Sequence, residues 1–134
     1  MSHDYLLSNV VPSPEEYCAL RKSVGLSEMT LSAAREALPR TLFMVSIRDK
    51  DTLIGMGRVV GDKGCFLQVV DIAVSPDYQK QGLSRRIMES IMHFIENEVP
   101  KCAVVSLFSD VDYLYQKFGF DTPKVSQGMF LKRS

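Results

Sequence analysis

A short polar segment, from Gln79 to Arg85, has the residue types of an anion-binding loop. Gly82 lets a bound group approach the backbone closely because it has no Cβ, and Lys80 and Arg85 add positive charge. Apolar residues then recur at four-residue intervals, which predicts an amphipathic helix: Leu83, Ile87, Ile91 and Ile95. Amides at a helix N-terminus and the positive end of its dipole suit a pyrophosphate. An ordinary strand-turn-helix with a chance glycine is the alternative.

Two shorter helices are expected nearer the N-terminus. The segment Ser13-Pro14-Glu15-Glu16 combines a capping serine, a proline suited to the first turn and a glutamate three residues after the cap. A helix should therefore begin here and run to about Val24. A second short helix should cover Thr30 to Leu38.

Three strands should follow and lead into the anion-binding loop. The segments Leu42 to Ile47 and Leu53 to Val60 flank Asp49-Lys50-Asp51, which predicts a hairpin. A third strand should run from Phe66 to Val74. The long helix after the loop should end at Pro100, because proline cannot continue a helix.

The C-terminal part is expected to add a strand and a helix. Ala103 to Phe108 reads as a short buried strand, Asp110 can cap a helix through Phe118, and Gly119 fits the position just past that helix. The final residues through Leu131 suggest one or two closing strands. Hairpin-paired strands followed by a strand-helix-strand-helix half describe an α+β domain in which only the central strand pair is parallel.

Composition is that of one globular domain spanning residues 1–134, with 46% hydrophobic and 24% charged residues. No apolar run approaches the ~20 residues that cross a bilayer, and the N-terminus lacks a secretory signal, so a cytoplasmic protein is expected. Sixteen basic and sixteen acidic residues give no global field for nucleic acid or an acidic membrane. The spacing of the three cysteines does not match a metal-binding or redox motif such as CxxC. We therefore expect Cys18, Cys65 and Cys102 to be free thiols, with Cys102 in the core.

The segment from Asp71 to Arg86 resembles the acetyl-CoA motif of the GCN5-related N-acetyltransferase (GNAT) family. In that family an apolar-Ala-Val strand end precedes a loop of pattern Q/R-x-x-G-x-G/A that opens a helix. The three signature positions are held here by Gln79, Gly82 and Ser84. Ser84 departs from the usual Gly or Ala, and its small hydroxyl could itself reach a phosphate oxygen or cap the helix. Asp112 to Phe120 is similar to the family's Tyr-x-x-x-Gly-Phe signature, so the resemblance covers Leu42 to Phe120.

The resemblance implies the GNAT fold: a mixed, mostly antiparallel central sheet flanked by helices, with a parallel strand pair splayed at the acetyl-CoA site. It also implies an acetyl-CoA-dependent N-acetyltransferase that moves the acetyl group to a primary amine by direct attack in a ternary complex. A backbone amide near Val74 would polarise the thioester oxygen, and no metal is needed. The implied cofactor-binding residues are Ile72, Ala73, Val74, Gln79, Lys80, Gln81, Gly82, Leu83, Ser84 and Arg85.

Two residues are candidates for catalysis. The resemblance places Tyr115 near the thioester sulfur, where its phenol could protonate the departing thiolate; the alternative is a core aromatic residue. The resemblance also puts potential substrate-facing positions at Gln68 and Val70, where relatives often carry Glu or His, and neither residue can act as a base. Asp71 is adjacent and ionisable, but strand alternation would turn it to the opposite face unless a bulge intervenes. General base, amine binder and structural acceptor all stay open for Asp71.

The sequence does not identify the acceptor amine. A small amine metabolite, a polyamine, an aminoglycoside-like compound and a protein terminus or lysine all fit, and a homodimer is compatible with each. Arg21, Arg40 and Arg58 could line an acceptor pocket, although surface arginines are the commoner case. The alternative function is a catalytically weak acetyl-CoA sensor or binding module with the same fold.

Overall fold

The computed structural model describes residues 5–109 and 112–133. Its elements in chain order are β1 (Leu6–Ser8), α1 (Pro14–Ser23), α2 (Leu31–Ala37), the 3-10 turn η1 (Leu38–Arg40), β2 (Phe43–Asp49), β3 (Thr52–Gly61), β4 (Phe66–Val74), the 3-10 turn η2 (Pro76–Tyr78), α3 (Leu83–Glu98), β5 (Val104–Leu107) and α4 (Asp112–Gln116).

The strands form one sheet in the order β1-β2-β3-β4-β5. All neighbours are antiparallel except β4 and β5, which confirms the predicted α+β class and its parallel pair. Pairing of β4 with β5 runs from Phe66 opposite Val104 to Val69 opposite Leu107. Beyond Val69, β4 continues to Val74 without this partner, so the two strands part here.

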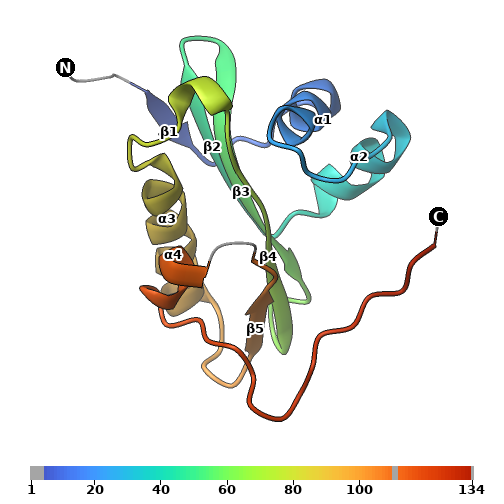
Figure 1. The fold of residues 1–134 in the computed structure, drawn as a ribbon, viewed down its shortest axis with the longest axis vertical. Helices are drawn as coiled ribbons and strands as arrows, with labels where there is room; N and C mark the ends of the chain where they lie inside the picture. Colours follow the sequence, from blue (N-terminus) through green and yellow to red (C-terminus); the bar gives the residue numbers. More distant parts are fainter. Residues whose placement is uncertain (1–4, 110–111, 134) are drawn as a thin grey trace.

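The sheet separates two helical layers (Figure 1). Helices α1 and α2 lie on one side of it and α3 and α4 on the other. The apolar face predicted for the long helix forms part of the hydrophobic core. Its residues Leu83, Ile87, Met88 and Ile91 are buried against the sheet. A smaller cluster, which includes Tyr17 and Leu20 of α1, packs against the opposite face.

A β-bulge in β4 changes which face its residues present. Leu67 and Val69 pack in the α3 cluster, so simple alternation would send Asp71 to the same side. The register instead shifts opposite Met56 and Arg58 of β3, and Asp71 adopts a left-handed φ of 61°. The extra residue turns the Asp71 side chain toward α1, where it bonds Tyr17 and Arg21.

The start of α1 is held as its sequence predicts. The Ser13 hydroxyl accepts from the Glu16 amide at 3.1 Å while the Glu16 carboxylate accepts from the Ser13 amide at 3.1 Å, which is a capping box. The same carboxylate accepts two hydrogen bonds from Arg48 of β2, at 2.6 and 2.9 Å. Helix α1 is therefore fixed to the sheet at its first turn.

Three expectations were wrong, and one element was missed. No strand forms in residues 121–133, because an extended segment becomes a strand only when it pairs, and here the tail passes β5 unpaired (Figure 1), with Val125 97% exposed. Cys102 is exposed in the turn before β5, not in the core. The edge strand β5 has exposed side chains such as Val104. The three-residue β1 was not expected.

Other expectations hold. All three cysteines are free thiols. Gly119 has the expected left-handed φ, 92°, but α4 ends at Gln116 rather than Phe118, because the last residues before Gly119 form a turn closed by the bond from the Gly119 amide to the Gln116 carbonyl. The proposed cap Asp110 lies outside the described residues. Within the part of the chain that the structure describes, no helix is both long enough and apolar enough to cross a bilayer.

The Glu16–Arg48 contact gives a pH-dependent prediction. The hydrogen bonds from Arg48 lower the pKa of Glu16 from 4.5 to about 2 in the folded protein. A depressed carboxyl pKa stabilises the fold above the unfolded value and loses that contribution as the pH falls from 4.5 toward 2. We expect Glu16→Gln to lose roughly 1 kcal/mol of unfolding free energy at neutral pH, because the group is partly solvated.

Urea unfolding of the parent and the variant across this pH range measures the effect. The difference in unfolding free energy between the parent and Glu16→Gln should become smaller as the pH falls. Glu15→Gln is the matched control, since Glu15 is exposed and lies 3.7 Å from Arg35. Equal losses in the two variants would show that the contact with Arg48 does not anchor α1.

Candidate active site

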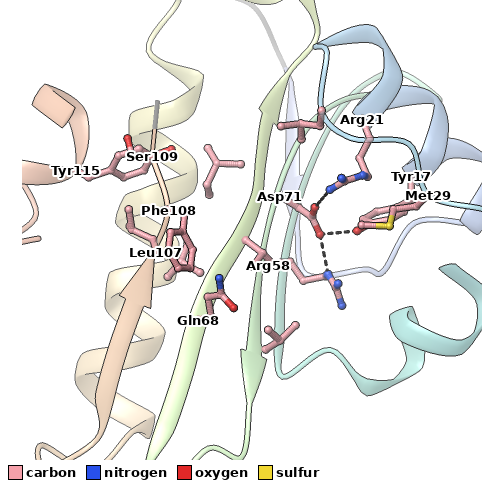
Figure 2. Close-up of a pocket in the computed structure, with 15 residues that line it drawn as sticks. Tyr17, Arg21, Met29, Arg58, Gln68, Asp71, Leu107, Phe108, Ser109 and Tyr115 are labelled. Carbon is pink, nitrogen blue, oxygen red and sulfur yellow. Dashed lines mark hydrogen bonds and ion pairs between the residues drawn. The ribbon is translucent and has the colours of Figure 1, made fainter. Parts of the chain in front are cut away.

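A cavity of about 440 Å³ opens where β4 and β5 part. Tyr115 and Ser109 line one side of it, and Asp71 with Arg58 lines the other, with β4 between them (Figure 2). The cavity therefore brings together Tyr115 and Asp71, the two catalytic candidates from the sequence. Gln68 and Val70, expected to face the substrate, also line it.

The Asp71 carboxylate is the centre of a buried polar cluster. It accepts a hydrogen bond from the Tyr17 hydroxyl at 2.6 Å and one from Arg58 Nε at 3.0 Å, and it pairs with Arg21 through Nη1. Its side chain is only 3% exposed. Figure 2 shows Arg21 and Arg58 reaching the carboxylate from different directions. Of the three roles left open for Asp71, its contacts match the structural acceptor most directly.

Arg21 and Arg58 are buried rather than on the surface, with exposed fractions of 7% and 8%. The Arg21 guanidinium also donates to the Ser27 carbonyl at 2.7 Å, and Arg58 Nη1 donates to the Thr41 hydroxyl at 3.0 Å. Arg40, the third arginine considered, is instead exposed and pairs with Glu36 at 2.9 Å. The sequence therefore named two of the pocket arginines without distinguishing them from a surface one.

Tyr17 is a site residue that the sequence analysis missed. Its ring lies beneath both guanidinium groups, 5.8 Å from Arg21 and 5.6 Å from Arg58. Burial, and next the hydrogen bond to Asp71, raise the pKa of Tyr17 above its usual value of 10.0. The phenol stays protonated at neutral pH and can only donate to Asp71. The available signal was the four-residue spacing of Tyr17 and Arg21, which puts both on one face of a helix.

The opposite side of the cavity carries Tyr115. This residue lies in α4, where the Phe118 and Phe120 amides both donate to its carbonyl, at 3.0 and 3.2 Å. Its ring is partly buried against the α3 core cluster while the side chain also borders the cavity. Tyr115 thus has features of both interpretations, since it packs in the core like a structural aromatic residue and borders the cavity as a proton donor would.

The anion-binding loop after β4 is anchored at several points. Gln79 Nε2 donates to the Val74 carbonyl at 2.9 Å, which closes the loop onto the end of β4. The Tyr78 hydroxyl donates to Asp49 at 2.6 Å, a contact that raises the pKa of Tyr78, and the Tyr5 hydroxyl donates to the Gln81 side chain at 3.2 Å. Signature residue Gln79 therefore shapes the loop through its side chain.

The N-terminus of α3 has backbone donors without an intrahelical partner. Its N-cap is Gly82, which has no side chain to cap the helix, and the Arg86 amide donates to the Gly82 carbonyl at 3.2 Å. The amides of residues 83–85 come before this bond and have no intrahelical acceptor. Lys80 and Gly82 have φ values of 66° and 77°, and left-handed residues of this kind turn successive amides toward one concave side.

This geometry fits a pyrophosphate. A Cβ built on Gly82 would meet no protein atom within 4 Å, so the space over the backbone is open. Lys80 and Arg85 are exposed beside it. Ala73, Val74 and Leu83 are buried, so these three can reach a ligand only through their backbone.

Comparison with known proteins identifies the family. Residues 39–122 match the model of the acetyltransferase (GNAT) domain. The chain belongs to the GNAT acetyltransferase family. This GNAT protein is thereby an acyltransferase, and its sheet with the parted parallel strands is the family's fold.

Similar proteins cover nearly the whole chain. Protein SA2161 of meticillin-resistant Staphylococcus aureus, a protein of unknown function described as a probable acetyltransferase, is 46% identical with a TM-score of 0.91 over 96% of this chain and 99% of its own. The uncharacterised N-acetyltransferase ycf52 of Pyropia yezoensis is 29% identical over 94% of this chain and 75% of its own. The Escherichia coli ribosomal-protein-S18-alanine N-acetyltransferase, 20% identical over 90% of this chain and 79% of its own, shares the fold with a TM-score of 0.71.

The buried cluster predicts a large stability effect for Asp71→Asn. The change would leave Arg21 and Arg58 buried without a compensating charge, and breaking a buried pair in this way costs about 3–5 kcal/mol. Chemical denaturation measures the loss. Asp77→Asn is the control, because Asp77 is an exposed aspartate in the next turn and should cost little. If Asp71→Asn unfolds at the same urea concentration as the parent, the carboxylate does not hold this cluster together.

Proposed function

We propose that this protein transfers an acetyl group from acetyl-CoA to a primary amine of a small molecule or protein, by direct attack in a ternary complex. The observation that carries the proposal is the continuity of β4. This strand borders the cavity at Asp71 and Ile72 and runs on into the loop and the open N-terminus of α3. One segment thus connects a pyrophosphate site to a polar pocket large enough for an acceptor.

The loop residues bind and orient acetyl-CoA, which supplies an activated thioester. The amides of residues 83–85 donate to its pyrophosphate, and Lys80 and Arg85 contribute positive charge. Gln81 and Ser84 lie in the same loop and helix start and border the bound pyrophosphate. Ile72 to Val74 hold the acyl end along β4, where a backbone amide near Val74 polarises the carbonyl oxygen.

Proton transfers are divided between the two sides of the pocket. Tyr115 protonates the leaving thiolate, since a phenol holds its proton at neutral pH and can release it to a developing anion. The amine must be neutral to attack, and its proton passes to water, because the Asp71 carboxylate is already occupied by three donors. Asp71 acts as the acceptor that positions Tyr17, Arg21 and Arg58.

Release of free thiol from acetyl-CoA, measured against a panel of amines, tests the proposal. Turnover that depends on an amine supports it. Acetyl-CoA binding without thiol release for any amine would favour a sensor, and no binding would contradict the assignment of the loop.

Gly82→Ala tests the loop. Because Gly82 has a φ of 77°, any side chain here is strained, so a control with equal strain is needed. Gly25 has a φ of 80° and equally open surroundings at the end of α1. Both alanine variants should lose roughly 1 kcal/mol of stability. Only Gly82→Ala should weaken acetyl-CoA binding, by about tenfold or more.

Calorimetric titration with acetyl-CoA and urea unfolding of both variants separate the two effects. An unchanged affinity in Gly82→Ala, or the same loss of affinity in Gly25→Ala, would argue against phosphate contact at this glycine.

Tyr115→Phe tests the acid. Turnover should fall by about 100-fold, the low end for general acids because a thiolate leaves tolerably well unassisted, while acetyl-CoA affinity changes little. The aromatic ring is kept, so the melting temperature should stay near that of the parent. Steady-state kinetics across the pH range give the answer. Turnover equal to the parent's would return Tyr115 to the role of a core aromatic residue.

A further inference from the structure

The polar cluster at the acceptor side of the cavity carries an excess of positive charge. Two buried guanidinium groups, Arg21 and Arg58, share the single carboxylate of Asp71. Tyr17 cannot supply a second negative charge, because burial and its bond to Asp71 raise its pKa. The formal charge of this buried group is therefore +1. Buried charges are normally paired, since removing an ion from water is costly.

Most of the unpaired donors belong to Arg58, because Arg21 directs four of its N–H groups to Asp71 and Ser27. A guanidinium has five N–H groups. Within the described part of the chain, Arg58 uses two of them, one from Nε to Asp71 and one from Nη1 to Thr41. The Nη2 group has no partner there and is accessible to solvent, since no buried side-chain nitrogen of the described residues lacks a partner. Three N–H groups thus remain, one on Nη1 and two on Nη2, and the outer edge that these two nitrogens form can bind a planar anion in bidentate fashion.

Arg58 lies where two cavities meet. Arg58 and Val60 border both the cavity of about 440 Å³ and a neighbouring one of about 480 Å³ next to α2. The charged residues that border the second cavity, besides Arg58, are Glu36 and Arg40, which pair with one another and cancel. The excess positive charge is therefore not removed on that side.

We propose that the acceptor amine carries a carboxylate group, which binds the outer edge of the Arg58 guanidinium. This specificity rests on the proposed function, because it concerns the second substrate of the same pocket. A carboxylate here completes a two-to-two pairing of charges in a buried site. Polyamines and aminoglycoside-like cations are disfavoured, since they would add positive charge to it.

Matched acceptors test the substrate class. Acetylation is measured with amino acids and with the same compounds lacking only the carboxylate, supplied as amides or as simple amines. We expect kcat/KM to be at least about tenfold higher for the carboxylates. Arg58→Met should remove this preference mainly through KM. The control Arg35→Met, in an exposed pair outside both cavities, should keep it.

A second measurement does not depend on turnover or on a folded variant. The parent protein, with CoA bound so that the proposed pyrophosphate site is occupied, is titrated with the same carboxylates without their amino group, which cannot be acetylated, and with inorganic phosphate. Protection against thermal unfolding by the carboxylates, but not by phosphate, is expected.

The outcomes separate the two proposals. Higher kcat/KM for polyamines, or stronger binding of phosphate than of carboxylates, would overturn the carboxylate assignment while the transferase proposal stands. No thiol release with any amine would contradict the proposed function, and the titration would still decide whether Arg58 binds a carboxylate.

Discussion

The single extra residue in β4 at Asp71 is the constraint on which the site depends. Without the bulge, strand alternation would turn Asp71 into the apolar cluster under α3. With it, the carboxylate faces α1 and accepts from Tyr17, Arg21 and Arg58. A left-handed aspartate is strained, and the three charge-assisted or short hydrogen bonds offset that strain. The bulge also lies just past the last β4–β5 pair, so the same few residues shape the acceptor side of the cavity.

Downstream of the bulge, β4 connects the two halves of the proposed reaction. The strand ends at Val74, and the contacts of Gln79 and Tyr78 fix the following loop to the end of β4 and to the β2–β3 hairpin. The amides at the start of α3 are therefore held in place before any ligand arrives. Preorganised donors of this kind bind an anion with little reorganisation, which is the advantage of building a site on rigid elements.

Much of this arrangement could be predicted because its signals are local. The capping box at Ser13 and the apolar stripe of α3 depend on neighbours in sequence, and the loop motif was recognised with them. The prediction of closing strands was wrong for the opposite reason, because an extended tail becomes a strand only if an edge strand pairs with it. The three-residue β1 carries too few residues for a pattern. The burial of Arg21 and Arg58 could not be foreseen either, since it follows from the face that the β4 bulge presents.

The chemistry of the pocket follows from charge as much as from shape. Tyr115 and the buried arginines border one cavity, but they border different parts of it, with β4 between them. A thioester held along β4 and an amine held from the side of α1 would meet where β4 and β5 part. In the proposed reaction, this division would give each substrate its own recognition element, an open helix terminus for the pyrophosphate and a cationic cluster for the acceptor.

The most direct test of this account is a map of backbone amide chemical shifts, recorded on isotope-labelled protein during titration with CoA. The account predicts that the largest changes fall on the amides of residues 79–86, together with those of β4 from Ile72 to Val74. Shifts concentrated elsewhere, with the amides at the start of α3 unmoved at saturation, would contradict it.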